Sequence, residues 1–385
     1  MVEDWQNGGF GLYIHWPFCQ AKCPYCDFNS HVAREIDQIK WLKAYLVELD
    51  RVAAEVPGRT LKTVFFGGGT PSLMDPMVVS TILEKVRSLW SVANDLEVTL
   101  EANPGSVEAK RFEGYRDGGV NRISMGIQSL NNYDLQKLGR IHTFEEAIAA
   151  FDIARQTFER VSFDLIYARQ NQTLEAWENE LRQALSMAID HLSLYQLTIE
   201  ENTAFGDRYD RGKLRGLPDD DLAAQMYEAT AAICQDHGFE NYEVSNYAKK
   251  GFESRHNQIY WRYGDYAGIG PGAHGRLTIN GEKLATECWR NPERWLQEVL
   301  SGSGESARVV VNQVEQSVEF LLMGLRLSEG VDLLRYENLS GRPLNQEKVN
   351  ALREMNMISV ENHRLTVLPQ GRILLNSVLS ELLTV

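Results

Sequence analysis

The sequence lacks the features of a membrane or secreted protein. None of its apolar runs approaches the ~20 residues that a membrane-spanning helix requires. The first residues, Met-Val-Glu-Asp-Trp-Gln-Asn, have neither the basic start nor the apolar run of a secretory signal. The five cysteines are few and odd in number, which argues against a disulfide framework. The sequence therefore predicts a cytoplasmic protein whose cysteines are reduced.

Positive charge is also scarce. The chain has 39 Lys and Arg against 53 Asp and Glu, a formal net charge of −14. Phosphate binding depends on clustered Lys and Arg, so we expect no nucleic-acid partner. Low-complexity tracts and short tandem repeats are absent as well. A length of 385 residues with 43% hydrophobic content predicts one large globular domain and a smaller one.

What the sequence does contain is a concentration of cysteine near its start. Cys19, Cys23 and Cys26 lie within eight residues, at spacings of four and three. Three thiolates on one short loop can bind one iron–sulfur cluster and leave one iron open for another ligand. Zinc usually takes four protein ligands, and Cys234 and Cys288 lie far along the chain. Metal-free structural cysteines are the other alternative, and Cys234 and Cys288 are expected to be small buried residues.

Six stretches rich in β-branched, aromatic or leucine residues alternate with amphipathic helical patterns. The predicted strands are Gly11–Pro17, Lys62–Phe66, Leu96–Ala102, Arg122–Gln128, Arg160–Tyr167 and His191–Ile199. The predicted helices are Glu35–Val56, Asp75–Trp90, Phe144–Phe158, Thr173–Met187 and Asp220–His237. Parallel strands need crossover connections, so this alternation predicts an α/β domain with a curved or barrel-like parallel sheet.

Polar residues follow the ends of these strands, where α/β domains bind their ligands. Gly67–Pro71 follows the second strand and would expose bare backbone groups there. Glu101, Gln128 and Arg140 lie at or after the ends of the third and fourth strands, and Asp164 lies within the fifth. Taken singly, each is typical of a capped turn or a satisfied surface group. Their shared position is what indicates a binding site.

These motifs resemble the radical S-adenosylmethionine (SAM) proteins. The resemblance rests on Cys-x-x-x-Cys-x-x-Cys after the first strand, Gly-Gly-Thr-Pro after the second and Glu-Ala-Asn-Pro after the third. It implies a partial (βα)6 barrel, a [4Fe-4S] cluster bound by Cys19, Cys23 and Cys26, and SAM on the open iron. Electron transfer from the cluster to SAM would then cleave the sulfonium bond. The positions that match the family's SAM-binding residues are Tyr13, Tyr25, Gly68, Gly69, Thr70, Glu101, Gln128, Arg140 and Asp164.

Within that superfamily the chain is similar to the HemN-like group. This group includes the oxygen-independent coproporphyrinogen III dehydrogenases and the shorter HemW heme chaperones. The dehydrogenases have a fourth cysteine two residues after the third, where this chain has Phe28. They also have a longer N-terminal segment, whereas twelve residues precede Tyr13 here. Both differences favour the chaperone group over the dehydrogenase alternative.

The segment His256-Asn-Gln-Ile-Tyr-Trp261 resembles the His-Asn-x-x-Tyr-Trp motif of the chaperone group. Heme needs an axial nitrogen and flat apolar surfaces, so the resemblance implies heme contact by His256, Tyr260 and Trp261. Without it, a hydrogen-bonded histidine in an aromatic core is the expected interpretation. His274 and His363 are further candidates for the heme ligand.

A smaller domain is predicted after a linker-like stretch at residues 301–306. We therefore expect a barrel domain over residues 1–300 and a winged-helix-like domain over residues 308–385. The second domain would contain helices at Gln316–Leu327, Val331–Leu339 and Gln346–Met355, a hairpin over Ile358–Pro369 and a last helix over Gln370–Leu383. Its weakly basic helices indicate a lid or a docking surface and no DNA contact.

The sequence thus predicts a heme chaperone that carries a [4Fe-4S] cluster and SAM and passes heme to apo-hemoproteins. Respiratory acceptors, and with them transient membrane contact, are what the resemblance implies. The alternatives are a coproporphyrinogen III dehydrogenase and a radical-SAM enzyme acting on an unrelated substrate, with the aromatic motif purely structural.

Overall fold

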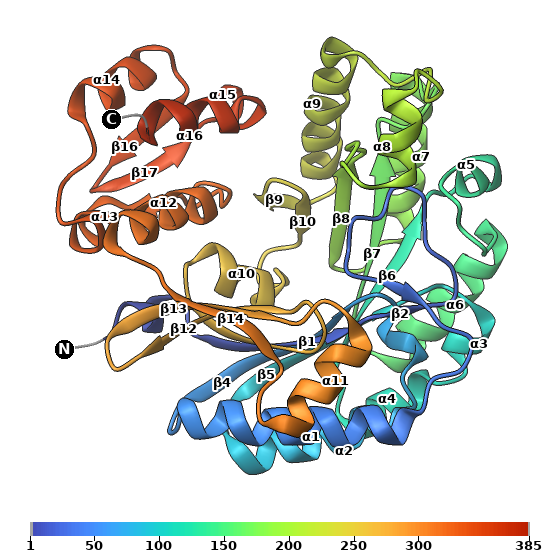
Figure 1. The fold of residues 1–385 in the computed structure, drawn as a ribbon. Coiled ribbons are helices and arrows are strands. Elements are labelled where there is room, and N and C mark those ends of the chain that lie inside the picture. Colours follow the sequence, from blue (N-terminus) through green and yellow to red (C-terminus); the bar gives the residue numbers. More distant parts are fainter. Residues whose placement is uncertain (1–2, 384–385) are drawn as a thin grey trace.

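A computed structural model describes residues 3–383. In this part of the chain a twelve-stranded sheet has the order β14-β13-β12-β11-β1-β4-β5-β6-β7-β8-β10-β9 (Figure 1). The six predicted strands are confirmed as a continuous parallel array with helical crossovers. They are β1 (Phe10–Trp16), β4 (Thr60–Gly68), β5 (Ser91–Ala102), β6 (Arg122–Gln128), β7 (Arg160–Tyr167) and β8 (His191–Gln196).

The helices that follow these strands cover the outer face of the curved sheet (Figure 1). The predicted helices are confirmed as α1 (Gln38–Glu55), α2 (Pro76–Leu89), α6 (Phe144–Thr157), α7 (Leu174–Met187) and α9 (Asp220–Asp236). Shorter ones are α3 (Ser106–Ala109), α4 (Phe112–Gly118), α5 (Asn132–Lys137) and α8 (Ala204–Asp210). Side-chain caps fix several starts, such as the capping box of Thr143 and Glu146 on α6.

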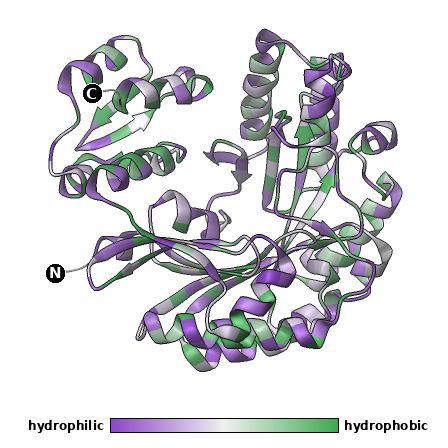
Figure 2. Ribbon diagram, in the orientation of Figure 1, coloured by the Kyte–Doolittle hydropathy of each residue, from purple (hydrophilic) through white to green (hydrophobic). Residues whose placement is uncertain are grey.

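In Figure 2, hydrophobic residues colour much of the strands and alternate with hydrophilic residues along the helices. Strand β1 is buried along almost its whole length, because helices cover one side and other elements fill the concave side. No helix within residues 3–383 combines the length and the apolar composition that crossing a membrane would take.

The sheet extends beyond the predicted six strands on both sides. Strand β11 (Asp265–Ile269) is parallel to β1 and continues into antiparallel β12 (His274–Ile279), β13 (Glu282–Cys288) and β14 (Glu305–Val310). On the other side, β10 (Asn246–Ala248) and β9 (Glu240–Glu243) follow β8. Helix α11 (Pro292–Ser301) precedes β14, so the stretch predicted as a linker ends a helix and begins an edge strand.

A buried ion cluster fixes this extension to the parallel strands. Asp265 is fully buried at the start of β11. Its carboxylate accepts hydrogen bonds from Arg59 at 2.6 Å and from Lys283 at 2.7 Å, and the Thr278 hydroxyl donates to it at 3.1 Å. Since Arg59 immediately precedes β4 and Lys283 lies on β13, this cluster holds the two parts of the sheet together.

The C-terminal residues form a separate hydrophobic core of helices around a three-stranded sheet. The helices are α12 (Gln313–Gly324), α13 (Leu333–Ser340), α14 (Gln346–Glu354), α15 (Pro369–Ile373) and α16 (Leu375–Leu383). The strands are β15 (Val331–Asp332), β16 (Ile358–Glu361) and β17 (Arg364–Val367). The predicted hairpin is confirmed. The last predicted helix is interrupted between α15 and α16, and α13 starts two residues later than predicted because β15 precedes it.

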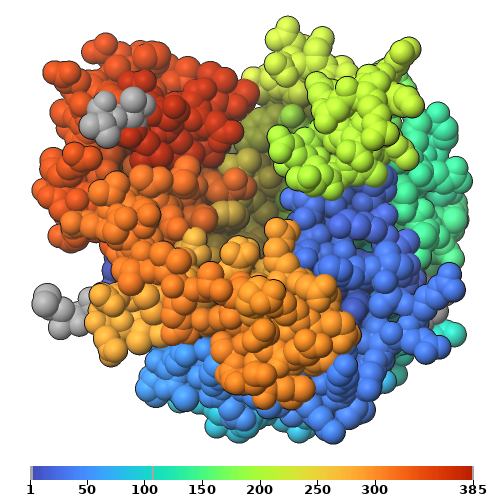
Figure 3. Space-filling view, viewed as in Figure 1, coloured from blue at the N-terminus to red at the C-terminus, as the bar shows by residue number. Residues whose placement is uncertain are grey.

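Ion pairs attach this C-terminal region to the barrel. They are Arg335–Asp4, Arg276–Glu319, Arg262–Glu329 and Arg326–Glu243. The region faces α8 and α9 across a hollow that the space-filling view shows between the red and the yellow-green residues (Figure 3). Helix α10 (Arg255–Trp261), which carries the aromatic motif, lies between the sheet and this region (Figure 1).

Candidate functional site

The three cysteines lie on the loop between β1 and α1. Cys19 ends the short strand β2 (Phe18–Cys19), which pairs with β3 (His31–Val32), and Cys26 closes a turn by donating its backbone N–H to the carbonyl of Cys23. The Thr70 hydroxyl lies 3.4 Å from the Cys19 sulfur, and the Arg140 guanidinium lies 3.4 Å from the Cys23 sulfur. Two of the three sulfur atoms thus each face a hydrogen-bond donor from a neighbouring loop.

This donor set fits an iron–sulfur cluster. Partial burial raises the pKa of the Cys19 and Cys26 thiols, so these groups are protonated at neutral pH until a metal binds. Within the described residues no three His, Cys, Asp or Glu side chains converge on one metal ion. A [4Fe-4S] cubane does not need three side chains that converge on one metal ion, because each thiolate binds a different iron atom. Hydrogen bonds from Thr70 and Arg140 would stabilise the negative charge on the sulfurs.

The glycine-rich loop after β4 lies directly against the cysteine loop. Gly69 donates its N–H to the carbonyl of Trp16 at 2.7 Å, and Thr70 donates its own to that of Phe18 at 2.8 Å. A Cβ atom at Gly69 would lie 2.7 Å from the carbonyl oxygen of Phe18. Gly68 has a φ of +109°, which favours glycine. Close backbone contact therefore requires glycine at position 69, and the backbone conformation favours it at position 68.

Arg140 connects the cysteine loop to the ends of β5 and β6. It donates to the side-chain oxygen of Asn103 at 2.8 Å and to the carbonyl of Gly126 at 2.9 Å. Asn103 in turn donates to the Thr70 hydroxyl at 3.3 Å. Within residues 3–383 the buried Nε of Arg140 and Oε1 of Gln128 have no hydrogen-bond partner. Such unpaired buried polar atoms are a feature of a site shaped for a polar ligand.

Two acids, Glu101 on β5 and Asp164 on β7, line one cavity on the curved sheet. Glu101 accepts the backbone N–H of Gly68 at 3.2 Å, and Asp164 lies 3.5 Å from the Ser124 hydroxyl. Burial, and then the nearby charge of Asp164, raises the pKa of Glu101 to about 8. Burial raises the pKa of Asp164 to about 6. At neutral pH these acids therefore hold protons more readily than exposed carboxyls do.

Two predicted tyrosines lie on either side of this region. The Tyr13 hydroxyl is 2.9 Å from Nδ1 of His15, and its ring stacks on Phe65. Tyr25 follows the second cysteine and packs against Phe205 of α8. The predicted SAM-binding residues therefore come from the cysteine loop, from β1, β4, β5, β6 and β7, and from the loops after β4 and α5.

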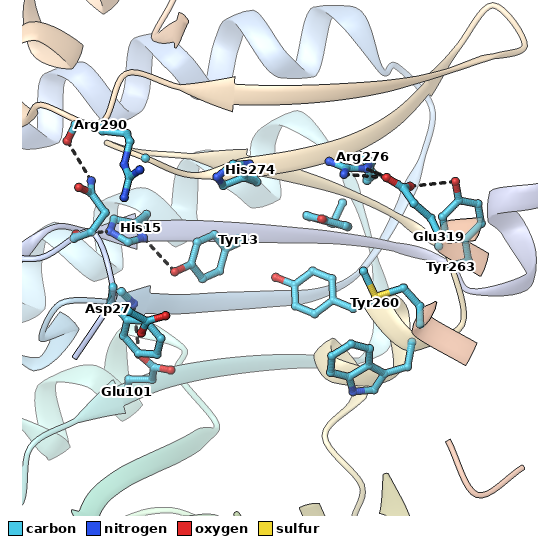
Figure 4. Close-up of a pocket in the computed structure, with 18 residues that line it drawn as sticks. Tyr13, His15, Asp27, Glu101, Tyr260, Tyr263, His274, Arg276, Arg290 and Glu319 are labelled. Atoms are coloured by element: carbon cyan, nitrogen blue, oxygen red, sulfur yellow. Dashed lines mark hydrogen bonds and ion pairs between the residues drawn. The ribbon is translucent and has the colours of Figure 1, made fainter. Parts of the chain in front are cut away.

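Two cavities open from this region. A cavity of about 200 Å³ inside the barrel is lined by polar groups that include Glu101, Asp164, Arg122 and Asn246. A larger cavity of about 580 Å³ lies between the barrel mouth and helix α12 (Figure 4). Tyr13, Glu101 and Tyr260 line both cavities. The larger cavity is lined by aromatic, basic and acidic residues: Tyr13, His15, Asp27, Phe28, Tyr260, Trp261, Tyr263, Tyr266, His274, Arg276, Arg290 and Glu319.

The aromatic motif divides between the core and the larger cavity. His256 is 1% exposed, and its ring nitrogens lie 2.6 Å from the Thr63 hydroxyl and 2.7 Å from the Tyr260 hydroxyl. Burial lowers the pKa of His256 to about 3, so the ring is neutral. Tyr260 and Trp261 line the larger cavity. Of the further histidine candidates, His274 also lines it, whereas His363 lies in the turn between β16 and β17.

Several site residues were missed by sequence reasoning. Asn103 belongs to the Glu-Ala-Asn-Pro motif, which also contains Glu101, and it hydrogen-bonds to Thr70 and Arg140. Its place in that motif was a signal that could have identified it. Arg276 and Glu319 come from segments 43 positions apart and form an ion pair at 2.9 Å on the cavity wall. Nothing local in the sequence marks that pair.

Comparisons with known proteins agree with these observations. The family model described as the radical SAM superfamily matches residues 13–184, and the model described as the HemN C-terminal domain matches residues 311–374. The chain is 39% identical to the protein named heme chaperone HemW of Escherichia coli, with 96% of each chain covered. It is also 37% identical to the mitochondrial radical S-adenosyl methionine domain-containing protein 1 of Bos taurus, covering 97% of this chain and 87% of that protein.

Among solved structures, coproporphyrinogen III oxidase (HemN) from Escherichia coli superposes with a TM-score of 0.82. The match covers 99% of this chain and 92% of that one at 20% identity, so it shows a shared fold. One assignment agrees with the cysteine loop, with the curved sheet and with the 39% identity to the Escherichia coli HemW protein over 96% of each chain. The chain belongs to the radical SAM superfamily and, among its HemN-like members, to the HemW family.

Proposed function

We propose that this protein is a heme chaperone, which binds heme in the larger cavity and passes it to apo-hemoproteins. The observation that carries the proposal is the chemistry of that cavity in a chain of the HemW family. Its volume of about 580 Å³ falls within the range of about 300–1,000 Å³ that small-molecule sites occupy. Tyr260, Trp261 and Phe28 offer flat apolar surfaces, and Arg276 and Arg290 offer positive charge for the heme carboxylates.

The cluster and SAM would lie at one end of this cavity. Cys19, Cys23 and Cys26 would hold the [4Fe-4S] cluster, and a reduced cluster with SAM bound supplies an electron that can cleave the sulfonium bond. The chain's own groups would bind SAM from several sides. Main-chain groups at Gly68–Thr70 provide polar contacts, Arg140 suits the SAM carboxylate, and Glu101 and Asp164 suit its hydroxyls or cations.

Phe28 forms part of the cavity wall, at the position where the sequence resemblance places a cysteine in the dehydrogenases. Its side chain is 58% exposed and lines the larger cavity. An exposed aromatic ring beside the cluster loop suits a flat macrocycle and supplies no thiol. This arrangement favours heme carriage over coproporphyrinogen decarboxylation.

The decisive test is transfer of heme under anaerobic conditions. Heme-loaded protein is mixed with an apo-cytochrome of the b type, and in parallel with apo-myoglobin, which reports spontaneous heme release. Directed transfer predicts a rate that rises with the concentration of the apo-cytochrome and exceeds the release rate. Equal rates with both acceptors, or decarboxylation of coproporphyrinogen III with SAM and a reductant, would refute the chaperone function.

We further propose that transfer takes place in the cytoplasm, to apo-proteins of the respiratory chain, with transient contact at the inner face of the cytoplasmic membrane. The net charge of −14 opposes adsorption to anionic lipid, so contact would depend on the acceptor. Co-sedimentation with vesicles of anionic lipid, with and without an incorporated apo-cytochrome, tests this. Binding to bare vesicles would contradict it.

A further inference from the structure

His274 is the histidine whose position in the larger cavity leaves it accessible. It lies at the start of β12, where neighbouring side chains alternate between the two faces of the sheet. Gly275 and Leu277 are buried on one face, whereas His274 is exposed on the face that lines the cavity. Figure 4 shows its ring near those of Tyr13, two strands away in the same sheet, and Tyr260 of α10. Within residues 3–383 its side chain forms no hydrogen bond and no ion pair.

His256 has a different environment, although it belongs to the aromatic motif. Both of its ring nitrogens lie within hydrogen-bond distance of a hydroxyl group, from Thr63 and from Tyr260. Its ring also stacks on Phe65 at 5.0 Å between centroids. A metal needs a free nitrogen lone pair, so coordination by His256 would require the loss of a buried hydrogen bond.

Two arginines lie on either side of His274 along the same wall (Figure 4). Arg276 lies two residues along β12, and so on the same face. It already binds a carboxylate, because it donates to both oxygens of Glu319, at 2.9 and 3.2 Å. Arg290 is exposed, and its guanidinium forms no ion pair within residues 3–383.

We infer that His274 is the axial ligand of heme in the larger cavity, and that Arg276 binds a heme carboxylate. This inference rests on the proposed function and goes beyond it by naming the ligand and the groups that orient the macrocycle. A neutral imidazole supplies the iron ligand, while the planar guanidinium of Arg276 matches a carboxylate at the edge of the macrocycle. Phe28, Tyr260 and Trp261 then contact the ring faces or edges.

The ion pair on the cavity wall makes the carboxylate assignment testable. Glu319 is on α12, and it also accepts the Tyr263 hydroxyl at 3.0 Å. A heme carboxylate at Arg276 competes with Glu319 for the same guanidinium. Binding therefore exchanges one carboxylate for another, and removing the charge of Glu319 should favour heme.

The ligand assignment is tested by anaerobic heme titration followed in the Soret region, with electron paramagnetic resonance of the ferric complex. His274→Ala should lose the histidine-ligated spectrum and bind heme about tenfold more weakly or worse. Excess imidazole should restore that spectrum in His274→Gly. His363→Ala, which removes a histidine outside both cavities, is the matched control and should behave like the wild type.

The carboxylate assignment is tested with heme dimethyl ester as a second probe. The wild type should bind heme about tenfold or more tightly than the ester, and Arg276→Gln should reduce that preference. Glu319→Gln should tighten heme binding and leave ester binding unchanged. Arg262→Gln, which breaks an ion pair to the C-terminal region outside the cavity, should leave the preference intact.

The outcomes separate this inference from the proposed function. If the wild type binds heme and His274→Ala keeps the same spectrum and affinity, His274 is not the ligand and the inference is wrong, although the chaperone function stands. If the ester binds as tightly as heme, the arginine assignment is wrong. If the wild type binds no heme, both the function and the inference fall.

Discussion

The contact between the glycine-rich loop and the cysteine loop predicts the effect of a single methyl group. Gly69→Ala would place Cβ 2.7 Å from the carbonyl oxygen of Phe18 and 3.0 Å from its nitrogen and carbonyl carbon. Ordinary carbon–oxygen contacts begin at about 3.3 Å, so the backbone at Phe18 must move by roughly 0.6 Å. All three atoms belong to the backbone, so a side-chain rotation cannot relieve the clash.

This displacement acts on the cluster site. Phe18 precedes Cys19, whose sulfur lies 3.4 Å from the Thr70 hydroxyl, and Thr70 also donates its N–H to Phe18. Moving the strand therefore disturbs one thiol and the donor that faces it. We expect Gly69→Ala to cost about 1–3 kcal/mol of stability, as overpacking does, and to lower the iron and sulfide bound per chain.

Gly58→Ala provides the matched control. Gly58 lies two residues before the start of β4, whereas Gly69 follows its end. Gly58 has a φ of +72°, and a Cβ atom there would meet no atom within 4 Å. Alanine in this conformation costs about 1–2 kcal/mol, a comparable loss without any contact with the cysteine loop. Anaerobic reconstitution, iron and sulfide analysis and thermal unfolding of both variants make the comparison. Full cluster loading and wild-type SAM binding by Gly69→Ala would refute the reasoning.

Four further predictions follow from particular groups. SAM affinity, measured by calorimetric titration, should rise with pH up to about 8, because the sulfonium cation favours the ionised form of Glu101. The variant Glu101→Gln should show a flat pH profile of SAM affinity, and a slope that persists in this variant would contradict the prediction. Asp265→Asn should destabilise the protein by about 3–5 kcal/mol in urea unfolding, because two buried cations lose their carboxylate, and a loss below 1 kcal/mol would be inconsistent with the ion cluster. Cys234→Ala and Cys288→Ala should keep the full iron content, as both thiols are buried away from the cysteine loop, so iron loss in either variant would assign it a ligand role. Arg335→Gln, which removes a bidentate pair to Asp4, should speed proteolytic cleavage before α12 several-fold, and unchanged cleavage would show that this pair does not hold the C-terminal region.

The parallel part of the fold was predictable because its strands are rich in β-branched, aromatic or leucine residues and are separated by long amphipathic helices. The antiparallel extension was not, since its strands mix polar and small residues. Strand β14 reads Glu-Ser-Ala-Arg-Val-Val and is exposed along nearly its whole length. Its pairing with β13 depends on a partner that no local pattern reveals. The start of α12, by contrast, carried a usable signal in the capping box of Asn312 and Glu315.

Most of the site was predictable for a related reason. Residues that follow parallel strands meet at one edge of the sheet, whatever the remaining fold does, so Gly68, Glu101 and Arg140 could be grouped from their positions alone. The larger cavity could not be predicted. Part of its lining comes from β12 and α12, and only tertiary packing brings these elements beside the parallel strands.

The two histidines show why a motif and a ligand need not coincide. His256 and Tyr260 are four residues apart on a helix, so their side chains lie on one face and hydrogen-bond to each other at 2.7 Å. A buried neutral imidazole is stable when both nitrogens have partners, and Thr63 supplies the second one. The histidine of the motif therefore positions the tyrosine that lines the cavity. Loss of heme binding in His256→Ala would follow from a displaced Tyr260 as readily as from a lost ligand. Imidazole added to His274→Gly distinguishes the two causes. If it restores the histidine-ligated spectrum, the iron ligand is at His274, whereas a ligand at His256 would leave the spectrum of His274→Gly like that of the wild type without any imidazole.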